Sequence, residues 1–194
     1  MIKMIRNEHP FCLAARWQEW TERYVSARRA NPSARFSWYS QSCYRATRDA
    51  LLALTREHCA FCDGFVGNEG RKTLEHFRPK SAYPQLAFCW ENLFPCCDVC
   101  QSAKGEKYTE LLLKPDEHDY CFEHYFICNF SDGALHPAPE IAAQDGLRAE
   151  KTLELYGLNS PSRKVARRRE LQKFLAVRDE MDIDEFPYRY FLMV

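Results

Sequence analysis

The sequence lacks a long run of apolar residues, and it lacks an excess of charge of either sign. Its 194 residues are 46% hydrophobic and include 27 basic and 27 acidic side chains, so the formal net charge is zero. No uninterrupted apolar stretch reaches the length that would span a bilayer, so no membrane role is expected. The first residues are too few and too polar for a secretory signal, and we find no internal repeats. The chain fits one domain, or one compact core with helical additions.

The missing basic excess limits how the chain can bind nucleic acid, because a protein that grips long duplexes alone usually carries one. Basic residues occur instead in local clusters at 71–80, 104–107 and 163–169. The first two clusters contain candidate phosphate ligands, Arg78, Lys80 and Lys104, although Lys104 is equally a candidate helix-end charge. The third cluster is either a solvated helix face or a docking face for a partner or RNA.

Cysteine, by contrast, is abundant: ten residues in a chain with no apparent signal segment, which predicts a reducing, cytoplasmic location. Four of them form two Cys-x-x-Cys motifs, Cys59 with Cys62 and Cys97 with Cys100. Four thiolates at this spacing predict a closed tetrahedral Zn²⁺ site, which is structural because no position is left for water. Its binding energy would be folding energy for the segment between the motifs.

Two residues leave alternatives to that ligand set. Cys96 and Cys100 form a second possible pair, but the matched spacing favours Cys97. His58, beside Cys59, is the histidine that could compete for a coordination position. Burial is the expected fate of the cysteines outside the site, which are Cys12, Cys43, Cys89, Cys96, Cys121 and Cys128.

Apolar periodicity predicts two N-terminal helices, at about 11–30 and 42–57, separated by a break at 31–33. Turn chemistry at 67–70 and a short strand carrying Glu75 and His76 predict a β-hairpin that closes onto His76. Residues 81–96 suit a structured connection that leads Asn92 back over the site, and a short helix is expected at about 101–107. Hairpin and helix with Zn²⁺ at the ends form a ββα-metal core.

The rest of the chain predicts a second hairpin and two helices. Residues 120–130 alternate loosely before a turn at 131–133, and one helix is expected at about 145–156, stopped by Gly157. Another begins at Ser160 as N-cap with Pro161 in the first turn. The apolar tail 186–194 is expected to pack. The predicted class is α+β, with an N-terminal helical segment (1–57), the core (58–115) and a C-terminal segment (116–194).

The residues around the predicted zinc site suit phosphodiester hydrolysis, which needs an activated water and a cation beside the growing negative charge. His76 is the candidate general base, since imidazole titrates near neutral pH. Glu75 and Gln101 are candidate oxygen ligands for Mg²⁺. Neighbours on an ideal strand point to opposite sides, so Glu75 and His76 can serve one site only if the chain bends. Asn92 is expected to orient the histidine loop.

These motifs resemble those of the HNH endonucleases, and more closely the PtuB-type nucleases of Septu and retron antiphage defence systems. The resemblance covers about residues 50 to 180 and rests on the two cysteine motifs, on Glu75-His76-Phe77-Arg78-Pro79-Lys80-Ser81, on Trp90-Glu91-Asn92-Leu93 and on the Gln-x-x-Lys after Cys100. It implies a nuclease with structural Zn²⁺ and catalytic Mg²⁺ or Mn²⁺, cutting DNA as first choice and RNA such as tRNA as second.

By the same resemblance His76 matches the first H of the family motif, Asn92 the N and Gln101 the final metal ligand, where the family more often has Asn or His. It also implies a partner, an SMC- or ABC-like ATPase of the PtuA type, and in the retron versions a reverse transcriptase with its RNA–DNA product. The competing interpretation is a non-catalytic zinc module that binds nucleic acid or protein.

Overall fold

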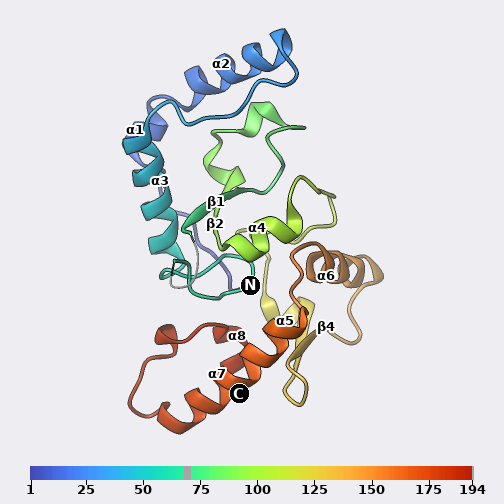
Figure 1. Ribbon diagram of the computed structural model, residues 1–194. Coiled ribbons are helices and arrows are strands. Elements are labelled where there is room, and N and C mark those ends of the chain that lie inside the picture. The colour runs from blue at the N-terminus through green and yellow to red at the C-terminus, as the bar shows by residue number, and fades with distance from the viewer. Residues whose placement is uncertain (68–70, 194) are drawn as a thin grey trace.

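The computed structural model describes residues 1–67 and 71–193 and shows an α+β protein with two small antiparallel sheets. In Figure 1 the N-terminal helices lie at one end of the molecule, helices α7 (Pro161–Val177) and α8 (Arg189–Leu192) lie at the other, and the first hairpin lies between them. Among the described residues, no helix is long and apolar enough to cross a membrane.

The N-terminal region contains the helices that the periodicity predicts, with one difference. The helix expected at 11–30 is broken at residues 15–16. The last helix of the region begins after Ser40, whose hydroxyl accepts a hydrogen bond of 3.2 Å from the Cys43 backbone N–H. The helices are α1 (Phe11–Ala14), α2 (Trp17–Ala30) and α3 (Gln41–Leu54).

The first hairpin is built from β1 (Thr73–His76) and β2 (Leu93–Cys96), in a register that pairs Thr73 with Cys96 and His76 with Leu93. The predicted strand carrying Glu75 and His76 is therefore present. Its partner was expected before the turn at 67–70, but it lies within the expected connection; residues 68–70 of that turn lie outside the described residues. The connection holds two 3-10 turns, η1 (Pro84–Leu86) and η2 (Trp90–Asn92).

Helix α4 (Asp98–Lys104) follows β2 directly and begins three residues before the predicted start. The reason is local, because Cys97 acts as the N-cap and its Sγ accepts from the backbone N–H of Cys100 at 3.5 Å. The second cysteine motif thus forms the first turn of a helix.

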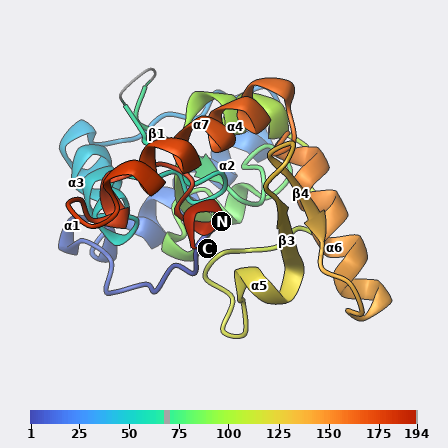
Figure 2. The same ribbon diagram turned by 90° about the horizontal axis from the view of Figure 1, so that it is seen from below.

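The C-terminal region forms the predicted second hairpin and two long helices, and α6 packs beside the hairpin (Figure 2). Gly133 turns the hairpin at φ +83°, where a Cβ would lie 2.1 Å from the Lys164 carbonyl. Ser160 precedes the second long helix, as predicted. The elements are α5 (Phe122–Tyr125), β3 (Phe126–Asn129), β4 (Ala134–Pro137), α6 (Ala143–Leu155), α7 (Pro161–Val177), η3 (Ile183–Glu185) and α8 (Arg189–Leu192).

Two hydrophobic cores meet at the β1–β2 hairpin. Leu74 and Leu93 belong to the aromatic-rich core that α1, α2 and α3 cover. Phe94 and Cys96 belong to the larger core, which draws residues from the N-terminus, the cysteine motifs and the C-terminal region. The larger core thus crosses both expected segment boundaries, after residue 57 and after residue 115, and that division stays a prediction.

The apolar tail packs on the protein, as expected for residues 186–192. Tyr190 and Phe191 are buried. Arg189 binds the buried Asp63 carboxylate through two guanidinium nitrogens, at 2.5 and 3.0 Å, so the tail is fixed to the loop of the first cysteine motif. A buried pair of this kind leaves a costly unpaired charge when one partner is removed.

The cysteines outside the predicted zinc site differ from the expectation of simple burial. Cys96 is fully buried, but Cys121 is exposed and Cys89 and Cys128 are half-buried. Cys12 and Cys43 form a disulfide that joins α1 to α3. Their spacing of 31 residues gives no signal for this bond, because it depends on how the two helices pack.

Candidate functional site

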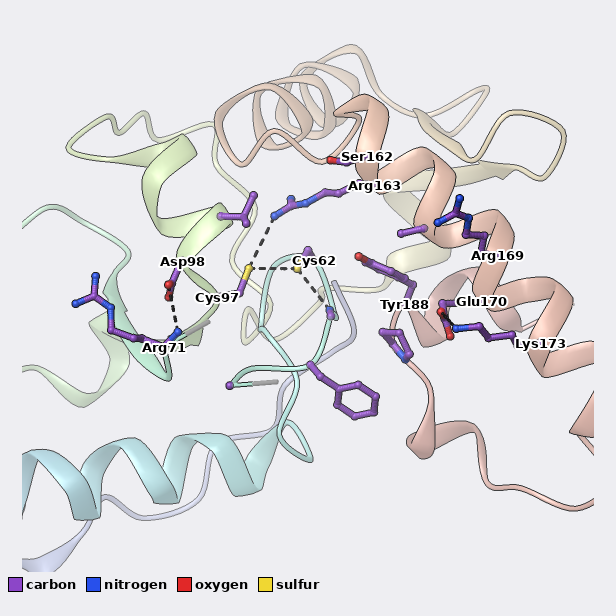
Figure 3. A pocket seen from close by; sticks show the side chains of 16 residues that line it. Cys62, Arg71, Cys97, Asp98, Ser162, Arg163, Arg169, Glu170, Lys173 and Tyr188 are labelled. Carbon is purple, nitrogen blue, oxygen red and sulfur yellow. Dashed lines mark hydrogen bonds and ion pairs between the residues drawn. The ribbon is translucent and has the colours of Figure 1, made fainter. Parts of the chain in front are cut away.

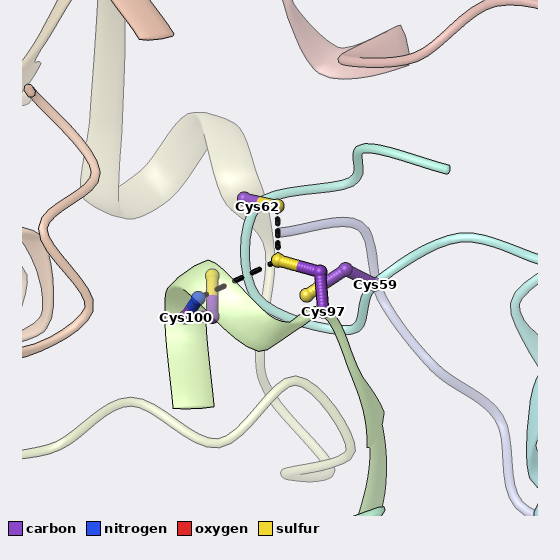
Figure 4. Close-up of side chains that lie close together, drawn as sticks. All are labelled: Cys59, Cys62, Cys97 and Cys100. Atoms are coloured by element: carbon purple, nitrogen blue, oxygen red, sulfur yellow. Dashed lines mark hydrogen bonds between the residues drawn. The ribbon is translucent and has the colours of Figure 1, made fainter. Parts of the chain in front are cut away.

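The four cysteines of the two motifs converge at one point between the loop after α3 and the start of α4 (Figure 4). Their sulfur atoms all lie within 4.8 Å of one another, and the Sγ atoms of Cys62 and Cys97 are 3.7 Å apart. Tetrahedral Zn–S bonds of about 2.3 Å place sulfurs about 3.8 Å apart. The donor set and its spacing therefore fit Zn²⁺.

The four thiols lie close enough to shift one another's pKa values. Burial raises the pKa of Cys100 well above its usual value, whereas hydrogen bonds with Cys100 lower the pKa of Cys62 and of Cys97. Backbone N–H groups also point at the sulfurs, as at Cys62, which accepts from Gly64 at 3.4 Å. These donors stabilise thiolate, which is the form that binds a metal.

Neither alternative ligand belongs to the set of four converging sulfurs, although the Cys96 thiol lies next to Cys59 and Cys100. Cys96 is directed to the Cys97 carbonyl at 3.4 Å, and burial raises its thiol pKa well above the usual value. His58 uses its Nε2 on the Phe186 carbonyl at 3.0 Å and its Nδ1 on the Arg56 carbonyl. Cys97 is thus the partner of Cys100 in the second motif.

Glu75 and His76 point to opposite sides of β1, so the strand does not bring them into one site. Glu75 faces α4, where its Oε1 lies 2.5 Å from the Lys104 Nζ. Burial raises the pKa of Glu75, and Lys104 and then Gln101 partly oppose that rise. The Gln101 amide also donates to the Leu74 carbonyl at 3.0 Å.

Lys104 does not contact solvent in this structure, so it could meet a phosphate only after release from its partners, and its role in phosphate binding stays a prediction. Its side chain is 0% exposed, and its Nζ donates to Glu75 and to the carbonyl of His76 at 3.1 Å. The sequence contains a signal for the pairing of Lys104 with Glu75. A helix capped by Cys97 places Cys100 and Lys104 on the same face, one turn apart, so both point toward the hairpin.

His76 lies on the aromatic side of β1 and is 7% exposed. Its Nε2 is 2.9 Å from the Ala87 carbonyl, which assigns the proton to Nε2 and leaves a lone pair on Nδ1. The ring of Phe36, from the segment between α2 and α3, packs edge-on against the imidazole with centroids 5.2 Å apart. Burial, and secondarily the charge of Lys80, lowers the pKa of His76 to about 3. The imidazole is therefore neutral at pH 7.

Asn92 fastens the loop that follows His76. Its Oδ1 accepts from the Arg78 backbone N–H at 2.8 Å, and its Nδ2 donates to the carbonyls of Arg78 and Leu86 at 3.0 and 3.1 Å. Asn92 thus orients the histidine loop through the backbone, whereas the imidazole itself is held by Ala87.

Arg78 and Lys80 are half-exposed on the same loop. Arg78 contacts the exposed Glu110 at 2.9 Å and lies over the ring of Tyr108. The Nζ of Lys80 lies 5.4 Å from the ring centroid of Phe36. Both cations are close to His76 in the chain. Among the described residues, the groups that they contact are either exposed or aromatic. A phosphate could therefore replace those groups as the partner of each cation.

Two further residues touch the candidate sites without any motif that marks them. Phe36 covers His76, and Arg163 of α7 reaches the cysteine sulfurs. Their positions depend on how distant helices pack, so sequence spacing carries no signal for them.

Fold and site together define an α+β protein with a four-cysteine centre that can hold a metal ion. No protein-family model matches the chain. A 57-residue segment, 29% of the chain, is 39% identical to the Septu protein PtuB of Bacillus thuringiensis. The aligned segment covers 22% of the length of that PtuB. The chain is therefore related to PtuB over part of its length.

Proposed function

We propose that this chain is a metal-dependent endonuclease of the HNH type that acts within a Septu-type antiphage defence complex. The observation that carries the proposal is the neutral imidazole of His76, which keeps a free lone pair on Nδ1 while Ala87 holds its other nitrogen. Asn92 fixes the loop behind it, and the four-cysteine centre closes the far end of the same hairpin. The partial identity to PtuB supports the defence role.

The proposed reaction is hydrolysis of a phosphodiester bond. Nδ1 of His76 accepts a proton from a water molecule as the water oxygen bonds to phosphorus, and the bond between phosphorus and the leaving oxygen then breaks. The leaving oxygen takes its proton from solvent. Arg78 and Lys80 oppose the negative charge that grows on the phosphate. Such contacts read the backbone and not the bases, so they do not divide DNA from RNA. DNA is the first choice of substrate from the resemblance to HNH endonucleases, and RNA such as tRNA is the second.

A divalent metal would supply a Lewis acid for the phosphate oxygens. Glu75 and Gln101 are the oxygen donors that the sequence offers for it, but they fit the metal poorly in this arrangement. The Glu75 carboxylate is buried and bound to Lys104, so a cation there would first have to displace the ammonium group. We therefore assign no step of the reaction to these two residues.

Activity requires the segment around Phe36 to move, because a substrate cannot reach an imidazole that is 7% exposed. Moving the ring would have two effects. It would uncover Nδ1, and it would admit water, which raises the pKa of His76 from about 3 toward its usual 6.5. A base with the higher pKa binds a proton more strongly, so opening would both expose and strengthen the general base.

A partner protein would account for two features, the burial of His76 and the lack of net charge on the chain. A nuclease without a strong grip of its own on nucleic acid can be delivered and opened by a complex, for which a PtuA-type ATPase is the proposed partner. A reverse transcriptase with its RNA–DNA product, as in the retron systems, stays a prediction from the sequence.

The second candidate is a non-catalytic zinc module that binds nucleic acid or protein. The specific observation in its favour is the buried Glu75–Lys104 pair, which removes the expected acid from the expected metal site. In this alternative His76 would serve only as a buried hydrogen-bond donor to Ala87.

Cleavage assays on the protein co-purified with its neighbouring ATPase separate the two candidates. Labelled plasmid DNA and total tRNA are incubated with and without Mg²⁺ or Mn²⁺, beside His76→Ala and the control His118→Ala, whose side chain is 97% exposed. The nuclease predicts metal-dependent cutting that His76→Ala lowers by about 100-fold or more. Equal cutting by both variants, or none by a zinc-loaded complex, would favour the module.

A further inference from the structure

Arg163 joins the four-cysteine centre to the C-terminal helices (Figure 3). It lies in the first turn of α7, and its side chain is almost fully buried. One terminal nitrogen, Nη2, is 3.0 Å from the Sγ of Cys100 and 3.8 Å from the Sγ of Cys97. The other, Nη1, donates to the carbonyl of Tyr156 at 3.0 Å, at the end of α6.

The chemistry of the metal site calls for such a cation. Four thiolates around one divalent ion carry a net charge of about −2, from four negative ligands and two positive charges on Zn²⁺. The sulfurs of Cys59, Cys62 and Cys100 belong to buried residues, and a buried charge without a partner is strongly unfavourable. N–H donors on the sulfurs of a metal site also fix and tune its ligands. An arginine guanidinium stays charged at any working pH, so Arg163 can supply that positive charge.

We infer that Arg163 is the buried counter-charge of the four-cysteine metal site, and that it links metal binding to the docking of helix α7. The link is reciprocal by thermodynamic necessity. If bound metal strengthens the contact between Arg163 and the sulfurs, then docked α7 strengthens metal binding by the same factor.

The position of α7 gives this link a structural consequence. A cavity of about 590 Å³ lies between α7 and the loops of the cysteine motifs, and Cys62, Cys97 and Arg163 all line it. Arg163 therefore forms part of the cavity wall beside Cys62 and Cys97 (Figure 3). Loss of its guanidinium would remove the N–H donor from the Cys100 and Cys97 sulfurs and leave more room beside them for water and chelators.

The simpler alternative is that Arg163 only closes the end of α6 through the carbonyls of Tyr156 and Gly157. Arg167 offers a matched control, because it lies one turn further along the same face of α7 and is 0% exposed. Its guanidinium binds the carbonyls of Gly133 and Leu158 but makes no contact with sulfur among the described residues. Comparing the two arginines separates a role at the metal from a role in helix packing.

The experiment compares the full chain with Arg163→Met, Arg163→Lys and Arg167→Met. Zinc release into a chelating dye is timed under native conditions, and the thiolate-to-metal absorption band is recorded on the Co²⁺-substituted proteins. We expect Arg163→Met to speed release by about 10 to 100-fold and to shift the Co²⁺ band. Arg163→Lys should restore part of both, while Arg167→Met should leave the band unchanged and speed release much less than Arg163→Met, because it weakens α7 docking without removing a donor from the sulfurs.

Hydrogen exchange on the unaltered chain tests the reciprocal half. Removal of the metal should reduce protection of α7 amides, and Arg163→Met should reduce it less in the metal-free protein than in the metal-loaded protein. The inference would be overturned if Arg163→Met and Arg167→Met speed zinc release equally. It would also be overturned if the hydrogen-exchange protection of α7 does not change when the metal is removed. If Arg163→Met does not fold, Arg163→Lys decides, because its release rate must lie above that of the unaltered chain. None of these measurements depends on nuclease activity.

Discussion

The two sides of the β1–β2 hairpin surround their buried functional groups with different kinds of partner. On the α4 and α7 side buried charges meet charged or metal-binding partners in the Glu75–Lys104 pair and in the contact of Arg163 with the cysteine sulfurs. On the aromatic side His76 contacts the ring of Phe36 and the Ala87 carbonyl, and burial, together with the charge of Lys80, lowers its pKa to about 3. One side holds charged groups in pairs, whereas the other keeps its titratable group neutral.

Removal of the metal should disturb the charged side most. Cys59→Ser takes away one of four ligands, and structural Zn²⁺ contributes about 10 kcal/mol or more to domains that depend on it. We expect this variant to lose bound zinc, measured by elemental analysis, and to lose cooperative unfolding in calorimetry. Cys121→Ser, at an exposed cysteine, is the control. A Cys59→Ser protein that unfolds like the control would show that the metal is dispensable for the fold.

Breaking the Glu75–Lys104 pair should have the next largest effect. Lys104→Met leaves a buried carboxylate without a counter-charge, which costs about 3–5 kcal/mol, measured by denaturant unfolding. The double variant with Glu75→Gln should recover most of the loss, and Lys107→Met, at an exposed lysine, should change stability by less than about 0.5 kcal/mol.

The same variant tests the proposed metal ligand. If Glu75 binds a catalytic cation once Lys104 is gone, Mg²⁺ should restore stability to Lys104→Met but not to the double variant. A Lys104→Met protein as stable as Lys107→Met would mean that the pair contributes nothing in solution.

The buried His76 on the aromatic side should make the free energy of unfolding depend on pH. His76 has a pKa of about 3 when folded and about 6.5 when unfolded, so the unfolded chain binds more protons between these values. Stability should therefore be complete above pH 6.5 and fall by up to about 1.4 kcal/mol per unit as pH drops toward 3. His76→Gln keeps a donor near Ala87 without titrating, so its curve should be flatter over this window. Equal slopes in both proteins would place the titrating group elsewhere; His118→Gln serves as the exposed control.

The contrast between the two sides also explains what sequence could and could not predict. The cysteine motifs, the strand with Glu75 and His76, and the start of α7 follow from spacing and capping, which are local properties. The direction in which Lys104 points could have been predicted in the same way, since the N-cap at Cys97 determines which face of α4 it lies on. The positions of Phe36 and Arg163, and the disulfide from Cys12, depend on packing between helices far apart in the chain, so no local pattern encodes them.

The smallest effect on stability, and the sharpest test of the covered state, is expected from Phe36→Ala. Phe36 is half-buried, so its loss should cost about 2 kcal/mol, less than the 3–5 kcal/mol of a fully buried phenylalanine. Removing the ring admits water to His76, which should raise the pKa of the imidazole toward 6.5, measured by NMR titration, and speed its modification by diethyl pyrocarbonate. Phe130→Ala, at a ring 45% exposed, should change neither property. If the pKa stays near 3, then Lys80 and the other groups around the imidazole, and not Phe36, keep His76 neutral. If the pKa rises together with the rate of cleavage, then the Phe36 ring controls access of substrate to His76.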